Sequence, residues 1–463
     1  MLNDSVRQYL QSHQAYFLDE LKALLSIPSI ANVEGGTGGE PCRRAATWLA
    51  RHLERMGLRV ELAPMNGGPA CVLGTGPQIP GRPTLLLYGH YDVQPAEPLE
   101  HWVSPPFEPT VRDGAVYARG ADDDKGQLFA HLMAIQAWQH AGGGLPVNLK
   151  LLLEGEEEVG SPHLEGFIVA NADRLRADVA ALSDSEFFAP GVPAITYGLR
   201  GLVAAELTVY GPRVDVHSGV HGGAVRNPVN ALAAIVAAMH DANGRVAIPG
   251  FYDAVAPLQE RERREWSQLG FDEPGYAVGL GLEHLGGGER DYAVLERLWA
   301  RPTLDCNGII GGYTGQGSKT IIPSKASVKI TMRLVNDQDP QAIFDALKRF
   351  VAKKTPVGVR AQLEPGSMAR PVLLAPDSPA MQAARTAYEE GFGTRPSMIR
   401  CGASIPVVEL LQRRLGLEAV VMGFGLEEDS LHSPNEHFLL SQLWGGALTS
   451  AAFMQALAEW AKG

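Results

Sequence analysis

The sequence predicts an α/β protein in which a mostly parallel sheet is flanked by helices and interrupted by an inserted α+β domain. Short apolar runs of the kind that fill buried parallel strands alternate with stretches that carry apolar residues at helical spacing. Between residues 200 and 371 the order changes to β-α-β-β-α-β, the ferredoxin-like arrangement. We therefore expect residues 1–199 and 372–463 to build one domain, with residues 200–371 inserted into it as a second.

The composition favours a soluble protein that acts on a small molecule. Of the 463 residues, 45% are hydrophobic and 20% are charged, which is ordinary for globular domains. The formal net charge of -12 offers no basic surface for nucleic acid or an anionic membrane, and no segment is long and apolar enough to span a bilayer. Residues 1–20 lack the apolar core of a signal peptide, and the four cysteines include no CxxC pair. These features predict a reducing, cytoplasmic location.

The individual elements follow from hydrophobic spacing and from proline. Residues 4–26 predict one amphipathic helix that ends before Pro28, and residues 41–56 predict a second helix. The other expected elements of the first domain are strands at 84–88, 114–118, 147–153, 178–182 and 419–422, and helices at 127–140 and 441–461. Those of the inserted domain are strands at 202–210, 304–310, 326–334 and 357–363, and helices at 227–241 and 340–352. Residues 248–302 form an insertion to which the sequence assigns no role.

Three successive glutamates, residues 156–158, follow the predicted strand at 147–153. Like charges this close raise one another's pKa, so the run favours either a solvated surface loop or a bound cation. Further polar residues come soon after other predicted strands: His90, the aspartates 122–124, Asp184 and His432. Because open α/β sheets bind ligands outside the carboxyl ends of their strands, we expect these segments to meet at one crevice.

The side chains of these segments can hold metal ions. The candidate ligands are two imidazoles and three carboxylates: His90, Asp123, Glu158, Asp184 and His432. This set is too large for one tetrahedral metal and suits two metals that share a carboxylate. Mixed histidine and carboxylate ligation favours Zn²⁺, with Mn²⁺ or Co²⁺ as alternatives. Glu157 is placed to act as a general base, and Asp92 follows His90 closely enough to orient its ring.

Five motifs, in this order, resemble the co-catalytic metallopeptidase family of carnosinase and cytosolic non-specific dipeptidase. They are HYDVQP (90–95), GADDDKG (120–126), EEVGS (157–161), SD (183–184) and HSPNE (432–436). Aminoacylase, succinyl-diaminopimelate desuccinylase and carboxypeptidase G2 are more distant members of this family. The resemblance covers almost the whole chain and implies a zinc-peptidase-like fold whose inserted domain serves as a lid and a dimerisation domain.

The resemblance also implies how the ligands divide between two metal ions. Asp123 would bridge the ions. His90 and Asp184 would complete one site. Glu158 and His432 would complete the other.

Further implied roles concern catalysis and substrate binding. Glu157 would be the base, and the peptide bond after Asp123 would be cis. His217, in the stretch 215–223, would stabilise the oxyanion in the neighbouring subunit's active site, so that the protein is expected to be a homodimer. The terminal carboxylate of the substrate would be held by residues of three matching segments: Thr320, Arg333 and Ser404.

Several assignments keep an alternative. Asp122 stands where relatives often carry a small or hydroxyl residue, although the Asp-Lys-Gly register favours Asp123 as the bridge. His437 competes with His432 for the role of ligand, and Arg333 can instead form a surface ion pair.

The expected function is metal-dependent hydrolysis of the amide bond of dipeptides or small peptides with a free C-terminal carboxylate. The reaction would use a metal-bridging hydroxide with Glu157 as the general base. The alternative within the family is an N-acyl-amino-acid amidohydrolase, a deacylase or desuccinylase. A non-catalytic scaffold or metal-storage protein should have lost the base, whereas Glu157 is present. The expected partner is thus a small peptide substrate, with no nucleic acid and no membrane.

Overall fold

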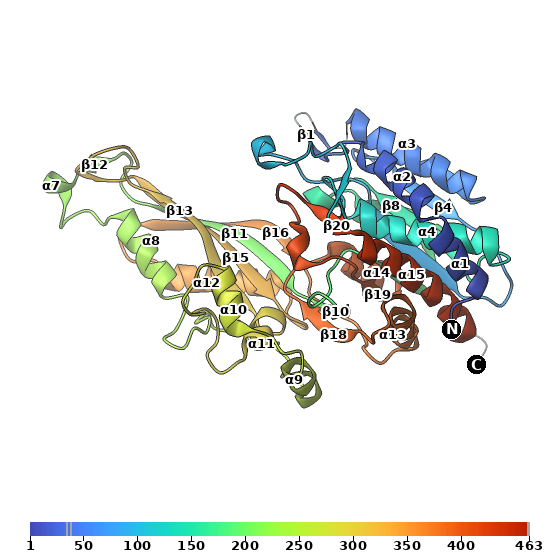
Figure 1. Ribbon diagram of the computed structural model, residues 1–463. Coiled ribbons are helices and arrows are strands. Elements are labelled where there is room, and N and C mark those ends of the chain that lie inside the picture. Colours follow the sequence, from blue (N-terminus) through green and yellow to red (C-terminus); the bar gives the residue numbers. More distant parts are fainter. Residues whose placement is uncertain (34–35, 38, 461–463) are drawn as a thin grey trace. The chain divides into compact units, whose positions relative to one another are not determined.

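The computed structural model describes residues 1–33, 36–37 and 39–460, which form two compact units (Figure 1). Unit 1 contains Met1–Tyr197, Leu374–Ile399 and the described residues from Pro406 onward. Unit 2 contains Gly198–Leu373 and the short segment Arg400–Ile405, which the sequence analysis assigned to the first domain. Unit 1 is thus built from segments on both sides of unit 2.

The large sheet of unit 1 has parallel strands at its centre. Its strands follow the order β10-β19-β9-β5-β8-β4-β3, and β18 pairs with β10. The pairs β19–β9, β9–β5 and β5–β8 are parallel. The pairs β10–β19, β8–β4 and β4–β3 are antiparallel. The bounds are β3 Arg59–Ala63, β4 Cys71–Thr75, β5 Thr84–His90, β8 Asn148–Glu154, β9 Val179–Leu182, β10 Ala194–Leu199, β18 Ser397–Cys401 and β19 Glu418–Met422. The predicted mostly parallel α/β sheet is confirmed.

Burial on both faces explains why the central strands read as continuous apolar runs. Leu85, Leu86, Leu87 and Tyr88 of β5 are each at most 1% exposed, and β5 lies between its parallel neighbours β8 and β9. A strand covered by helices on both faces has no position for a solvated side chain, so the alternation of polar and apolar residues is lost.

Helices of unit 1 flank this sheet (Figure 1). Their bounds are α1 Asp4–Ser12, α2 Gln14–Leu25, α3 Glu40–Arg55, α4 Lys125–Ala141, α5 Leu164–Ala170, α6 Ala172–Leu175, α13 Pro379–Phe392, α14 Pro406–Leu415 and α15 Leu440–Trp460. Every residue of α4 from Lys125 to Trp138 is buried, and this helix packs against α1, α2 and α15. The predicted helix at 441–461 corresponds to α15, except that Ala461 lies outside the described residues.

One prediction for this unit is wrong, and one predicted strand is present but pairs outside the large sheet. The helix expected at 4–26 is two helices, because His13 between α1 and α2 leaves the helical region with φ -111° and ψ 16°. The strand expected at 114–118 is β7, Ala115–Tyr117, which does not join the large sheet. It forms a separate antiparallel sheet in the order β20-β7-β6, with β6 Thr110–Arg112 and β20 His437–Leu439. Apolar spacing alone does not identify the partner of so short a strand.

Unit 2 has the predicted β-α-β-β-α-β order. Its four-stranded antiparallel sheet follows the order β13-β15-β11-β16, with β11 Gly201–Tyr210, β13 Thr303–Gly311, β15 Lys325–Leu334 and β16 Arg360–Ala369. The helices α8 Pro228–Ala237 and α12 Pro340–Lys354 share one apolar core with β11 and β15 (Figure 1). Alternate residues of β15 are buried, so Arg333 lies on the face opposite the buried Met332 and Leu334.

The remaining elements are short. They are β1 Asn32–Val33, β2 Gly36–Thr37, β12 Val216–His217, β14 Ile321–Ile322, β17 Val372–Leu373, α7 Ser218–His221, α9 Glu260–Ser267, α10 Glu273–Gly279, α11 Val294–Trp299, and the 3₁₀ turns η1 Leu99–His101, η2 Glu157–Val159 and η3 Glu427–Asp429. The helices α9, α10 and α11 belong to the insertion at 248–302 in unit 2. Among the described residues, no helix combines the length and the apolar character needed to cross a membrane.

Candidate metal centre

The carboxyl ends of three adjacent parallel strands deliver polar side chains to one edge of the unit 1 sheet. His90 is the last residue of β5, and Asp184 follows β9 by two residues. The turn η2, which carries Glu157 and Glu158, begins shortly after β8 ends at Glu154. Because β9, β5 and β8 are parallel neighbours, these segments emerge side by side.

Two further side chains reach this edge from loops. Asp123 lies just before α4, and His432 lies between η3 and β20. The described residues form two groups of potential ligands whose donor atoms lie within 4.8 Å of one another: His90, Asp123 and Asp184, and Asp123, Glu158 and His432. The structure thus brings together all five predicted ligands, and Asp123 belongs to both groups.

Asp123 faces one histidine with each carboxylate oxygen. Its Oδ1 lies 3.0 Å from Nε2 of His90, and its Oδ2 lies 2.9 Å from Nε2 of His432. The same nitrogen of His432 lies 3.4 Å from Oε2 of Glu158. A carboxylate that presents its two oxygens to two separate ligand sets has the arrangement required of a bridge between two metal ions.

The unbonded imidazole nitrogen and the crowded buried carboxylates of this site fit bound metal ions. Nε2 of His90 is buried and makes no hydrogen bond in the described structure, although Asp123 lies close to it. Burial, followed by the charge of Asp123, raises the pKa of Asp184 to about 7. Burial would also raise the pKa of Asp123, but the hydrogen bond with His432 and the close contact with the ring of His90 outweigh burial and hold that pKa below its usual range. Buried carboxylates crowded in this way are stabilised by a cation.

Asp92 organises the neighbouring segments. Its Oδ1 accepts a hydrogen bond from the backbone N–H of Glu157 at 3.2 Å, and its Oδ2 accepts one from Glu158 at 3.0 Å. The same carboxylate lies 3.4 Å from Nδ1 of His90, which also lies 3.2 Å from the backbone oxygen of Asp92. A donor at Nδ1 leaves Nε2 of His90 with its lone pair directed to the ligand group.

Two residues of the quoted motifs have contacts that the sequence did not reveal. Nε2 of Gln94 donates to Oε2 of Glu158 at 2.8 Å and to its backbone oxygen at 3.3 Å. Glu436 is completely buried and accepts backbone N–H groups of Asp122 and Asp123 at 3.1 and 3.2 Å. Gln94 lies in the motif HYDVQP and Glu436 in the motif HSPNE, which is the only signal that the sequence gives for them. No spacing rule connects either residue to a partner so distant in the chain.

The structure also separates the residues that competed for a role. Asp122 belongs to neither ligand group, and Nε2 of His437 lies 3.6 Å from Asp429 while its ring stacks on Tyr117. The peptide bond between Asp123 and Asp124 is cis, which confirms that expectation.

The predicted residues of unit 2 form two pairs. His217 lies close to Thr320 because β12 pairs with β14. The backbone N–H of Ser218, the residue after His217, donates to the backbone oxygen of Thr320 at 3.0 Å. Arg333 and Ser404 meet elsewhere, with Nη1 of Arg333 donating to Oγ of Ser404 at 3.1 Å.

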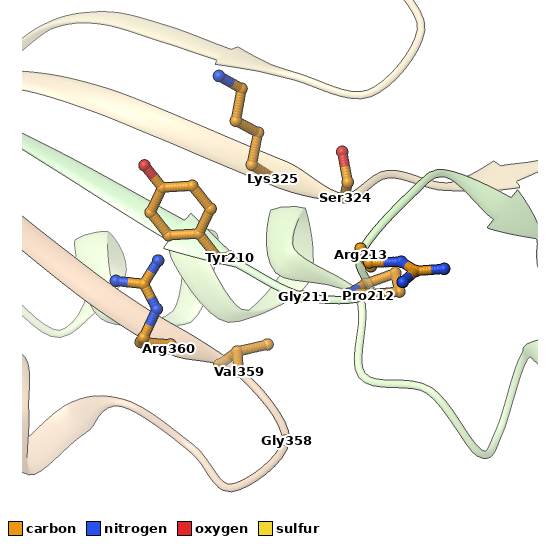
Figure 2. Close-up of a pocket in the computed structure, with 9 residues that line it drawn as sticks. All are labelled: Tyr210, Gly211, Pro212, Arg213, Ser324, Lys325, Gly358, Val359 and Arg360. Atoms are coloured by element: carbon orange, nitrogen blue, oxygen red, sulfur yellow. The ribbon is translucent and has the colours of Figure 1, made fainter.

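Unit 2 also carries a basic depression apart from these pairs. Figure 2 shows Tyr210, Arg213, Lys325 and Arg360 around a pocket of about 570 Å³, together with Ser324 and neighbouring backbone. None of the predicted site residues lines it.

Comparison with known proteins identifies relatives over nearly the full chain. Residues 86–456 match a family model described as Peptidase family M20/M25/M40. The Cys-Gly metallodipeptidase dug1 of Schizosaccharomyces pombe is 32% identical over 474 residues, which cover 98% of each chain. The Beta-Ala-His dipeptidase of Homo sapiens is 31% identical, over 99% of this chain and 93% of the relative.

A solved structure agrees with these relatives. The M20 family metallo-carboxypeptidase Sso-CP2 from Sulfolobus solfataricus superimposes with a TM-score of 0.86 at 33% identity. The match covers 96% of this chain and 99% of the other.

Proposed function

Because this chain belongs to peptidase family M20/M25/M40, and is therefore a metallopeptidase, we propose that it hydrolyses dipeptides or small peptides with a free C-terminal carboxylate. The observation that carries this proposal is the pair of ligand groups that share Asp123 beside Glu157. The names of two relatives identify enzymes that act on Cys-Gly and on Beta-Ala-His, which favours a dipeptidase over the deacylase alternative.

We assign the two ligand groups to two divalent cations. His90, Asp123 and Asp184 would hold one ion, and the shared Asp123 would hold the other with Glu158 and His432. Oxygen and imidazole nitrogen donors favour Zn²⁺, and Mn²⁺ or Co²⁺ suits the same set. Such ions supply Lewis-acid polarisation of a carbonyl and make bound water more acidic.

Glu157 is the proposed general base. Its backbone N–H is fixed by Asp92, so the carboxyl group stands next to the ligand Glu158. Burial raises the pKa of Glu157 well above its ordinary value, and neighbouring carboxylates including Asp184 raise it further, although His90 acts in the opposite direction. A carboxyl group with a raised pKa can take a proton from water and return it to a leaving nitrogen near neutral pH.

His217 is the proposed donor to the developing oxyanion. Its Nδ1 accepts a hydrogen bond from the backbone N–H of Gly219 at 3.0 Å, so the proton of a neutral ring lies on Nε2. The ring is exposed, and Nε2 is available to donate to a substrate oxygen.

The distance between the two pairs of unit 2 supports a homodimer. His217 pairs with Ile321 of β14, next to Thr320, and β14 comes just before the first residue of β15. Arg333 lies near the last residue of β15. β15 has ten residues and therefore spans about 33 Å at ~3.3 Å per residue. In Figure 1, β12 and α7 lie beyond the end of the unit 2 sheet. A dipeptide is too short to touch both pairs of one chain, so we assign His217 and Thr320 to the active site of a partner.

The edge of the unit 2 sheet offers a surface for this dimer. β13 is an edge strand, and its residues Ile309 and Ile310 are 60% and 66% exposed. An exposed apolar edge strand favours pairing with another chain. Unit 2 would thus serve as the lid and dimerisation domain.

We also propose a cytoplasmic location. All four cysteines are free thiols, as expected in a reducing compartment.

The proposed function is tested by hydrolysis assays with metal-reconstituted protein, with and without a chelator. The substrates are Ala-Ala, β-Ala-His, N-acetyl-Met and N-succinyl-diaminopimelate, and the Glu157→Gln variant controls for a contaminating peptidase. Chelator-sensitive cleavage of the dipeptides supports the proposal. Cleavage confined to the acylated amino acids contradicts it and identifies a deacylase.

A further inference from the structure

The segment Arg400–Ile405 is a loop of unit 2 held directly by Arg200. The backbone N–H of Arg200 donates to the oxygen of Ala403 at 3.1 Å, and Nε donates to the oxygen of Gly402 at 2.9 Å. Oγ of Ser404 donates in turn to the backbone oxygen of Arg200. Three contacts thus fix the loop against the residue that precedes β11.

Ser404 contacts the guanidinium of Arg333 and the backbone of Arg200, while the guanidinium of Arg200 contacts the same loop at Gly402. Nη1 of Arg333 donates to the hydroxyl of Ser404, which itself donates to the backbone oxygen of Arg200. Among the described residues, neither Arg200 nor Arg333 has a carboxylate within ion-pair distance. Asp305 influences Arg200 electrostatically, but it is exposed and accepts from Thr303 at 3.1 Å. Burial and, next, the charge of Arg333 lower the pKa of Arg200 to about 10, which leaves it protonated at neutral pH.

Two half-buried cations without a counter-charge favour an anion between them. Both Nη groups of Arg200 and the remaining donors of Arg333 are without protein partners in the described structure. A planar guanidinium binds a carboxylate through two parallel hydrogen bonds, and Ser404 adds a hydroxyl to the same place.

We propose that Arg200 is a second guanidinium of the subsite that binds the substrate's terminal carboxylate, and that the insertion at 248–302 holds the loop that completes it. The proposal rests on the proposed peptidase function and adds two elements to it. Arg200 becomes a substrate-binding residue beside Arg333 and Ser404, and the insertion acquires a positioning role.

The insertion fixes the loop at its first residue. Arg400 forms a buried ion pair with Glu262 of α9, and its guanidinium lies 5.6 Å from the ring centre of Trp266 on the same helix. The other carboxylate oxygen of Glu262 accepts from the backbone N–H of Gln259 at 3.0 Å, so Glu262 is itself held in place. Arg400 also donates to Oδ1 of Asn336 at 3.4 Å.

Gly402 shows how closely the loop is enclosed. A Cβ atom at this position would lie 2.9 Å from Nη2 of Arg200 and 3.2 Å from the backbone oxygen of Leu298, which belongs to α11 of the insertion. The loop therefore lies between Arg200 and the insertion, and a side chain at its centre would displace the guanidinium of Arg200 and press on the backbone of α11.

The test is calorimetric binding of Ala-Ala and of Ala-Ala amide to the metal-loaded enzyme in a Glu157→Gln background, which stops turnover. The ratio of the two affinities measures recognition of the carboxylate. We expect Arg200→Gln to lower this ratio by about tenfold to a hundredfold, because a hydrogen-bonded charge pair with the carboxylate is lost. Arg200→Lys should restore part of the ratio.

The role of the insertion is tested with Glu262→Gln and a matched control. Glu262→Gln should lower the same ratio by about threefold to tenfold, since a displaced loop weakens only part of the subsite. Glu265→Gln changes a half-exposed residue of the same helix, paired with Arg261, and should leave the ratio unchanged.

Failure of this proposal can be told from failure of the proposed function. Suppose that the parent enzyme cleaves dipeptides but Arg200→Gln leaves the affinity ratio of Ala-Ala to Ala-Ala amide unchanged, including the case in which both affinities fall equally. Arg200 then does not bind the carboxylate. If the parent cleaves no dipeptide yet binds the carboxylate form preferentially through Arg200, the subsite stands and the substrate assignment is wrong. A parent that binds neither ligand overturns both.

Discussion

The carboxylate of Glu436 is paired with the guanidinium of Arg119, with Oε2 2.7 Å from Nη1 and both side chains 1% exposed. The same carboxylate oxygen accepts the backbone N–H of Gly120 at 2.9 Å. The other oxygen, Oε1, accepts the backbone N–H groups of Asp122 and of the candidate bridging ligand Asp123. One buried carboxylate therefore joins the segment that carries His432 to the loop that carries Asp123.

We expect Glu436→Gln to lower the free energy of unfolding by about 3 to 5 kcal/mol, because the buried Arg119 loses its counter-charge. Urea denaturation measures this loss. The double variant Glu436→Gln/Arg119→Met should lose less than the sum of the two single variants, since it leaves no buried charge unpaired. Strictly additive losses would show that the two side chains do not stabilise each other.

Glu157→Gln and Glu158→Gln should separate catalysis from metal binding. Glu157→Gln is expected to lower kcat by about 10²- to 10⁴-fold while the metal content stays at the parental value, because only proton transfer is lost. Glu158→Gln should lower both activity and metal content. Elemental analysis of dialysed protein and initial rates distinguish the two variants. Normal turnover by Glu157→Gln would show that Glu157 is not the base.

Gln94→Met should weaken binding of the ion that we assign to Glu158. The amide of Gln94 fixes the orientation of the Glu158 carboxylate, and loss of such a partner typically lowers metal affinity by about 10- to 100-fold. Competition with a chromogenic chelator measures the affinity of each ion. Equal weakening of both ions, or of neither, would contradict this role.

Mixing two inactive variants tests whether His217 acts across a dimer. Glu157→Gln and His217→Ala each disable one part of the proposed site. A mixed dimer restores one complete site, so reassociated equal mixtures should recover about a quarter of the parental activity. Light scattering checks the oligomeric state. Full activity of a dilute monomer would exclude the arrangement.

His131 should make stability depend on pH. Its ring is fully buried between the hydroxyls of Ser183 and Ser450, at 2.8 and 2.7 Å, and burial lowers its pKa from 6.5 to about 4. In the unfolded chain the ring takes up a proton as the pH falls below 6.5, whereas the folded state resists protonation. The neutral ring of His131 therefore contributes about 3 kcal/mol to the free energy of unfolding above pH 6.5. This contribution is lost as the pH falls from 6.5 through 4.

Thermal denaturation between pH 4 and pH 7 measures this effect. His131→Gln should flatten the profile, because the substituted side chain carries no titrating group. His101→Gln, at an exposed position, should keep the parental slope. A slope that His131→Gln leaves unchanged would assign the dependence to other groups.

The sequence predicted most of the candidate metal centre because its ligands lie in short motifs after strong apolar runs. His90 and Glu158 are examples, since β5 and β8 are buried on both faces and hence easily recognised. The break at His13 was not predictable, because the apolar spacing continues through it. The partner of β7 was not predictable either, since three residues do not specify a sheet.

Long-range polar contacts were beyond the reach of sequence reasoning. Gln94 and Glu158 are separated by 64 positions, and Arg119 and Glu436 by 317. Local patterns record which face of an element is buried, but they do not record which distant side chain satisfies a buried donor or acceptor. Arg200 was missed for the same reason, because its partners lie in the segment Arg400–Ile405.

The discontinuity of unit 1 has a consequence for synthesis of the protein. Domains fold as the chain emerges from the ribosome, from the N-terminal side onward. The strands β5, β8 and β9 emerge early, but β19, which lies between β9 and β10, and α15, which packs on α4, emerge only after unit 2. A nascent chain therefore exposes part of its largest apolar sheet, and the surface of α4, until β19 and α15 have left the ribosome. During translation this sheet is the surface on which a chaperone would act.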